Sequence, residues 1–158
     1  MAAPEVSEVA QRHASTQERR RHTLLYVIVA MVSLIGLADA IYLTIEHLAG
    51  RSVQCTVVAG CSEVLGSAYA TVGGIPLAGI GALAYFTVFS CATLAIFEYR
   101  GALTLLRIVV ALMFLATLWL LFVQAFILHA FCAYCLLSAA VTLTMSGLMV
   151  AERIIKGK

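Results

Sequence analysis

The sequence predicts an all-α integral membrane protein, a bundle of four transmembrane helices. Of its 158 residues, 63% are hydrophobic and 11% are charged, whereas soluble domains average about 45–50% apolar and about 25% charged residues. Four apolar runs each reach the roughly 20 residues that a helix needs to cross hydrocarbon. They cover residues 24–45, 75–97, 103–128 and 131–151. Continuous runs of this length exclude barrel strands, whose residues alternate, and the composition excludes a water-soluble globule.

The charged residues predict the orientation of these spans. Residues 1–23 form a polar tail, and the first span lacks the short apolar core and the small-residue cleavage site of a signal peptide. We therefore expect this span, 24–45, to stay as an uncleaved anchor within the transmembrane domain 24–151. Basic residues favour the cytoplasm, which puts this tail and the tail 152–158 on the cytoplasmic side. The loop 46–74 then lies on the extracytoplasmic face. The net charge of +2 gives no support to nucleic-acid binding.

The loop 46–74 is too long for a simple link, since connections within helical bundles usually have about 2–8 residues. The pattern from Ser62 to Tyr69 predicts a short helix on the membrane surface, capping the bundle. The loop contains Cys55 and Cys61, and the fourth span opens with a second pair. Four of the five cysteines are therefore expected on one face of the membrane.

The spacing of the second pair, Cys132-x-x-Cys135, puts two sulfurs about one helical turn apart at a helix N-terminus, which lowers a thiol pKa. Cys55 and Cys61 would close an exposed ring that exchanges readily with external thiols. On a face where disulfides persist, the two pairs predict a relay. A partner's dithiol reduces the loop pair, the loop pair reduces the second pair, and a bilayer quinone beside Cys135, menaquinone or ubiquinone, takes up the electrons.

Other interpretations remain open from the residues alone. A C-x-x-C in an apolar helix can be two small packing residues, which is also our interpretation of Cys91 in the second span. The four outer cysteines, with His47 and His129, can instead hold a metal, or form structural disulfides in a non-catalytic membrane subunit. Four cysteines allow three full pairings, and the sequence does not choose among them.

Several short motifs occur in a specific order along the chain. They are Tyr42-Leu43, Cys55 and Cys61, Ser67-x-Tyr69-Ala70, Gly74-Ile75-Pro76, Gly81-x-x-x-Tyr85 and Cys132-x-x-Cys135. In this order and spacing, from about Gly36 to Ala151, the chain resembles the vitamin K epoxide reductase family, and its bacterial members in particular. The resemblance implies a thiol:quinone oxidoreductase of the bacterial cytoplasmic (inner) membrane, with four helices around a quinone and the loop as a cap.

The resemblance also implies roles for individual residues. Cys55 would exchange with the redox partner, Cys61 would form a mixed disulfide with Cys132, and Cys135 would pass electrons to the quinone. Ser67 matches a position that lines the catalytic pocket, although an ordinary helix cap explains it equally simply. Disulfide-bond protein B, a convergent enzyme, carries its C-x-x-C in the first outer loop, the reverse of the order here.

Three departures from the family narrow the expected function. Vertebrate members have an asparagine where this chain has Leu77 and a tyrosine where it has Ala139, so plain quinone reduction is expected rather than epoxide reduction. Some bacterial relatives continue into a fused thioredoxin-like domain, whereas this sequence ends soon after Ala151. We therefore expect a thioredoxin-fold, DsbA-like partner in trans.

Three further residues are candidates for binding the quinone. Asp39 lies within the first span, where an acid is costly enough to suggest a function, such as handling the protons of quinone reduction. Its alternative is a neutral side chain that hydrogen-bonds Gln124 or Thr117. Phe131 and Tyr134 flank the C-x-x-C and would wall the quinone pocket, or else anchor the helix at the interface.

Overall fold

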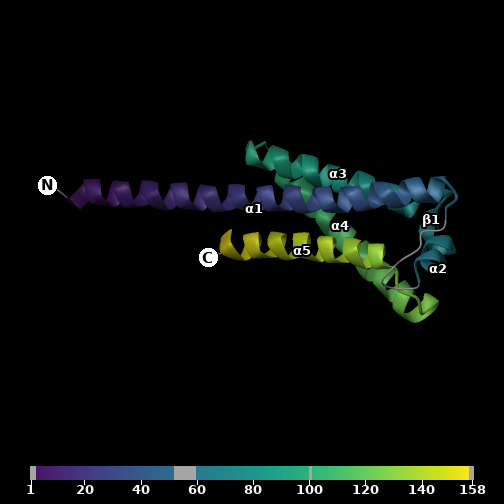
Figure 1. The fold of residues 1–158 in the computed structure, drawn as a ribbon. Coiled ribbons are helices and arrows are strands. Elements are labelled where there is room, and N and C mark those ends of the chain that lie inside the picture. Colours follow the sequence, from purple (N-terminus) through teal and green to yellow (C-terminus); the bar gives the residue numbers. More distant parts are fainter. Residues whose placement is uncertain (1–2, 52–59, 100, 157–158) are drawn as a thin grey trace.

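The computed structural model describes residues 3–51, 60–99 and 101–156, and its four long helices confirm the predicted fold class (Figure 1). They are α1 (Ala3–Leu48), α3 (Leu77–Ile96), α4 (Ala102–Phe122) and α5 (Ala133–Lys156). Each contains a segment long and apolar enough to cross a membrane. Helix α1 extends through the polar tail, N-terminally of the start predicted at Leu24. In Figure 1 the N- and C-terminal ends of the chain lie toward the same end of the bundle.

The segment between α1 and α3 builds a cap at the other end of the bundle (Figure 1). It contains α2 (Cys61–Gly66), the 3-10 turn η1 (Ala68–Ala70), and the strands β1 (Thr71–Val72) and β2 (Ile75–Pro76). The short helix predicted in this loop is therefore present as α2. The strands pair antiparallel, with Thr71 opposite Pro76. Gly73 and Gly74 form the turn between the strands. Both have positive φ, a backbone conformation that residues other than glycine rarely adopt.

Helix α4 does not end cleanly but continues into the π-helical segment η2 (Val123–Leu128). His129 then adopts a left-handed conformation with φ of 48°, which ends the helix and turns the chain back toward α5. Wide helical turns of this kind often occur at functional sites. Here the turn brings the start of α5 to the same end of the bundle as α2.

The core is formed where the four helices meet. Tyr85 and Val88 of α3, Leu106 of α4 and Met145 of α5 are all at most 1% exposed. Tyr85 packs over Gly36 of α1, where a Cβ would collide with the tyrosine ring. The outward faces carry many exposed aliphatic and aromatic side chains, as expected for surfaces that contact lipid.

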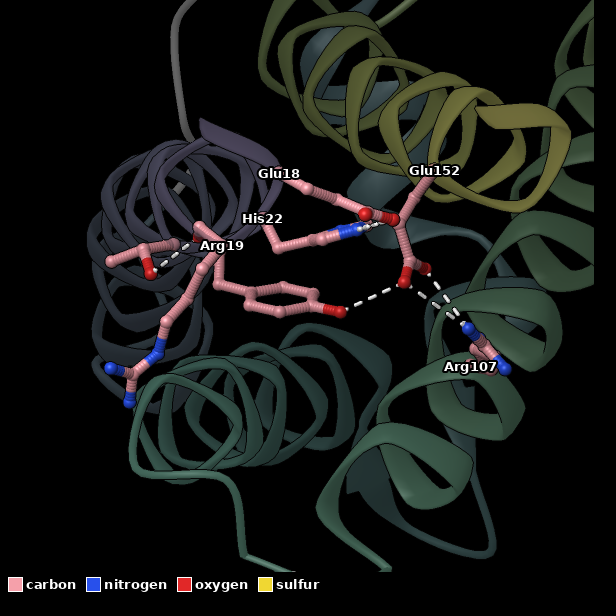
Figure 2. Close-up of polar contacts among 7 residues, drawn as sticks. Glu18, Arg19, His22, Arg107 and Glu152 are labelled. Carbon is pink, nitrogen blue, oxygen red and sulfur yellow. Dashed lines mark hydrogen bonds and ion pairs between the residues drawn. The ribbon is translucent and has the colours of Figure 1, made fainter. Parts of the chain in front are cut away.

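A buried polar cluster joins three helices at the end of the bundle away from α2 (Figure 2). Glu152 of α5 is fully buried. It accepts a 2.8 Å hydrogen bond from the hydroxyl of Tyr26 and forms a 3.0 Å ion pair with Arg107 Nη2. Glu18 and His22 of α1 lie beside this cluster, with His22 Nε2 3.8 Å from Glu18 Oε1. These contacts link α1, α4 and α5 to one another at this end of the bundle.

Candidate active site

Cys61 at the start of α2 and Cys132 just before α5 lie against each other, with their sulfur atoms 3.5 Å apart. Both side chains are at most 1% exposed. Cys61 is disulfide-bonded, whereas Cys132 and Cys135 are free thiols. Thiol–disulfide exchange begins with attack of a thiolate on a disulfide sulfur, so this contact joins the two groups that such an exchange needs. Cys55 lies outside the described residues.

Gly60 allows this contact because α2 begins directly against the link between η2 and α5. A Cβ at Gly60 would lie 2.7 Å from the Phe131 carbonyl oxygen and 2.8 Å from the Phe131 nitrogen. Both neighbours are backbone atoms, which cannot move aside as a side chain would. A side chain at position 60 would therefore push Cys61 away from Cys132.

Hydrogen bonds fix Cys132 from the other side. Its N–H donates to Oε1 of the buried Gln124 at 3.1 Å, and its carbonyl accepts the N–H of Leu136 at 2.9 Å. Cys132 therefore stands at the N-terminal end of α5, immediately outside the helix. The N–H of Cys135 points back at the Cys132 sulfur, at 3.4 Å.

These donors favour a Cys132 thiolate. Hydrogen bonds from the Cys135 thiol and from the backbone N–H groups of Cys135 and Tyr134 lower the pKa of Cys132 to about 7, against the opposing effect of burial. A thiolate is the nucleophilic form of cysteine. The sequence-based expectation of an activated thiol at this helix N-terminus thus has a defined physical cause.

Behind Cys135, a cavity of about 330 Å³ lies between the long helices and beneath the cap. Its volume falls within the range of pockets that hold small organic molecules, about 300–1,000 Å³. Most of its walls are aliphatic side chains and alanines. Its polar lining includes Asp39 from α1, Tyr85 from α3, and Cys135, Ser138 and Thr142 from α5.

The hydroxyl of Tyr85 joins α3 to α5 at the back of the cavity. It lies 3.0 Å from the Ser138 carbonyl, 2.8 Å from Ser138 Oγ and 3.0 Å from Thr142 Oγ1. If its single proton goes to the carbonyl, both hydroxyls can donate to its oxygen. This arrangement uses the full hydrogen-bonding capacity of the Tyr85 hydroxyl.

Comparison with known families identifies the kind of protein to which the chain belongs. The model of the vitamin K epoxide reductase family matches residues 27–150, which is most of the chain. The chain belongs to this family. It is therefore a membrane thiol–disulfide oxidoreductase, of a family whose members generally use quinones. No curated protein matches the sequence. Within the described residues no group of three or more His, Cys, Asp or Glu side chains is placed to hold a metal ion.

The residues proposed to bind quinone in this family member fall into two groups. Ser67 and Asp39 line the cavity. The Ser67 hydroxyl also donates to the Val64 carbonyl at 2.7 Å, so it caps α2 as well. Phe131 is 43% exposed, and the ring of Tyr134 packs against Tyr42 with centroids 5.4 Å apart. Neither is among the lining residues, and a contact of either with quinone stays a prediction.

Sequence reasoning missed several residues of the site. Ser138 and Thr142 follow Cys135 at i+3 and i+7, so the helical period places all three on one face of α5. That spacing was a usable signal for a polar stripe facing the cavity. Gln124 was considered only as a partner of Asp39, yet its side chain accepts the N–H of Cys132. No local pattern in the sequence indicates that pairing.

Proposed function

We propose that this protein is a thiol:quinone oxidoreductase that reoxidises an extracytoplasmic, thioredoxin-fold (DsbA-like) partner and so supports disulfide-bond formation. The observation that supports it is a continuous path. The free Cys132 touches the disulfide-bonded Cys61 on one side, and its C-x-x-C neighbour Cys135 lines an apolar cavity on the other. The proposed orientation places this end of the bundle outside the bacterial inner membrane.

Electrons pass from the partner to the Cys132–Cys135 pair in three stages of thiol–disulfide exchange. The partner's dithiol reduces the disulfide between Cys55 and Cys61, and the partner becomes oxidised. The Cys61 thiolate attacks Cys132 in a Cys132–Cys135 disulfide, which forms the mixed disulfide and releases Cys135 as a thiolate. Attack by Cys55 on Cys61 then restores the loop disulfide and leaves Cys132 and Cys135 reduced. A bonded Cys61 with free Cys132 and Cys135 corresponds to this last state.

In the final step, two electrons and two protons pass from the Cys132–Cys135 dithiol to the quinone, the electron-accepting substrate. The products are a Cys132–Cys135 disulfide and a hydroquinone. Cys135 is the cysteine that lines the cavity, so it is the thiol in position to meet the quinone ring. The mainly aliphatic walls suit a quinone ring and exclude water from the transfer.

The cavity walls favour an unmodified quinone over a quinone epoxide. Leu77 and Ala139, which replace a polar asparagine and a tyrosine of the vertebrate members, both line the cavity. Neither can donate a hydrogen bond through its side chain. Two polar side chains of the vertebrate members are therefore replaced by apolar ones in the wall of this cavity.

The test is reduction of ubiquinone or menaquinone by the detergent-solubilised protein, followed optically with a reduced DsbA-like protein as donor. We expect turnover by the wild type and its loss in Cys132→Ala and in Cys135→Ala. Cys91→Ala is the matched control, because Cys91 is a buried thiol in the core of α3 away from the cavity lining. Loss of turnover in Cys91→Ala, or no turnover by the wild type with either quinone, would overturn the proposal.

A further inference from the structure

Asp39 stands apart from the other polar groups that line the cavity. Its side chain is 8% exposed, and among the described residues Oδ2 has no hydrogen-bond partner. The expected alternative of a bond to Gln124 or Thr117 is not seen in this part of the chain: the Gln124 oxygen accepts the N–H of Cys132 instead. Buried polar atoms are nearly always paired, and an unpaired one calls for an explanation.

Four hydroxyl groups of the cavity lining are already engaged in hydrogen bonds. The Tyr85 hydroxyl bonds to Ser138 and Thr142, and the Ser67 hydroxyl bonds to the Val64 carbonyl. These groups give the cavity its shape but have no free proton directed at a ligand. The carboxyl of Asp39 is the polar group in this set whose hydrogen-bonding capacity is unused.

The part of the cavity wall formed by the described residues gives Asp39 no permanent cation. Among these residues, no lysine or arginine lines the cavity. The titratable side chains that line it besides Asp39 are His47 from α1, Tyr69 from η1, Tyr85 from α3 and Cys135 from α5. A carboxyl group in such surroundings is more stable as the neutral acid than as an unpaired anion, and the neutral acid carries a proton that it can give away.

We propose that the Asp39 carboxyl donates a proton to the quinone oxygen during reduction. The inference rests on the proposed thiol:quinone activity. As the Cys132–Cys135 disulfide forms, the two electrons of the dithiol enter the quinone. Asp39 protonates one oxygen of the reduced ring, and one of the two thiol protons goes to the other oxygen. The second thiol proton, released as the disulfide closes, goes to the Asp39 carboxylate. The net reaction stays one dithiol and one quinone giving one disulfide and one hydroquinone, and Asp39 ends as it began.

The test is single-turnover reduction of menadione and of short-chain ubiquinone by pre-reduced protein, with wild type, Asp39→Asn and Asp39→Glu compared. An amide keeps the shape and a hydrogen-bond donor but cannot exchange a proton in this way. General acid catalysis typically contributes 10²–10⁴-fold. We therefore expect Asp39→Asn to slow quinone reduction at least about 10²-fold, with less than about a tenfold change in the quinone concentration that gives half the maximal single-turnover rate. Asp39→Glu should recover part of the rate.

Two readouts do not depend on turnover. The rate of exchange between Cys61 and Cys132 in quinone-free protein should be the same in wild type and Asp39→Asn. The infrared carboxylic-acid band of oxidised wild type should shift when menadione binds, and the shift should be absent in Asp39→Asn. Ser33→Ala is the matched control, because Ser33 is a fully buried polar residue of α1 that bonds to the Ala30 carbonyl and does not line the cavity.

The outcomes distinguish a failure of the proposed role of Asp39 from a failure of the proposed function. Quinone reduction by Asp39→Asn within about twofold of wild type overturns the role of Asp39 while leaving the proposed function standing. Equal losses of quinone reduction and of thiol exchange in Asp39→Asn also overturn it, because they show a residue that positions the cysteines. If the wild type itself fails to reduce either quinone, the proposed function fails and the inference fails with it.

Discussion

The sulfur atoms of Cys61 and Cys132 lie 3.5 Å apart although 71 positions separate the two residues. The contact joins the cap to the start of α5, and two other residues hold the cysteines in place. Gly60 lets the two segments approach, and Gln124 holds the N–H of Cys132. Both dependences can be tested separately.

Replacing Gly60 by alanine should disrupt the contact between the two sulfurs. The added Cβ would meet the Phe131 backbone at 2.7–2.8 Å, and a displacement of about 1 Å in a reacting pair can reduce the rate on the order of 10²-fold. The measurement is the rate at which the Cys61–Cys132 mixed disulfide forms in a Cys135→Ala background, followed by peptide mass spectrometry. Gly66→Ala, where a Cβ meets nothing within 4 Å, should form it at the parent rate. Equal rates in the two variants would contradict the steric argument.

Replacing Gln124 by leucine should destabilise the start of α5. The change leaves the Cys132 N–H buried without its acceptor, which costs about 1–3 kcal/mol. Thermal unfolding in detergent measures the loss. Ser90→Ala is a suitable control, since that hydroxyl bonds to the Phe86 carbonyl within its own helix and is exposed. A stability loss no greater than in the control would mean that Gln124 does not anchor Cys132.

The length and apolarity of the four runs were sufficient to predict the helices, because crossing a bilayer imposes both conditions on the sequence itself. The short helix near Ser62 could also be predicted, since the pattern of residues that favours it is local in the sequence. The contact of Cys61 with Cys132 was not derivable from the residues, and only the family resemblance implied it. The reason is that Gly60 acts by letting α2 lie close to the Phe131 backbone, and these two segments meet only in the folded bundle.

The aromatic residues beside the C-x-x-C show a different limit. Tyr134 and Phe131 are next to the cysteines in sequence, but Phe131 precedes α5. Within α5, adjacent residues point about 100° apart, so the position of Tyr134 beside Cys135 does not place it on the same face. The ring of Tyr134 instead packs against Tyr42. The residues at i+3 and i+7 from Cys135, Ser138 and Thr142, were the better candidates for the cavity wall.

The reactivity of Cys132 should depend on pH around neutrality. Hydrogen bonds, chiefly from the Cys135 thiol, lower the pKa of Cys132 to about 7. Attack of the Cys132 thiolate on the Cys61 disulfide, the reverse of the proposed forward step, should therefore slow as pH falls below about 7 and the thiolate is protonated, and its rate should reach a plateau above that pH. In Cys135→Ala the main donor is lost, so the pKa of Cys132 rises and the midpoint moves to higher pH. Thiolate absorbance in a Cys91→Ala background measures both midpoints, and coincident midpoints would show that Cys135 has no part in activating Cys132.

The buried cluster at the far end of the bundle should contribute to stability through Arg107. Arg107→Leu leaves the fully buried Glu152 with its Tyr26 hydrogen bond but without this ion pair (Figure 2). Breaking a buried pair costs about 3–5 kcal/mol, and we expect the low end because the Arg107 side chain is 38% exposed. Adding Glu152→Gln should recover part of the loss, since no charge then remains buried. Arg19→Leu breaks an exposed pair with Glu98 and should change little. Unfolding in mixed micelles compares the variants, and equal losses in Arg107→Leu and Arg19→Leu would contradict a stabilising role for the cluster.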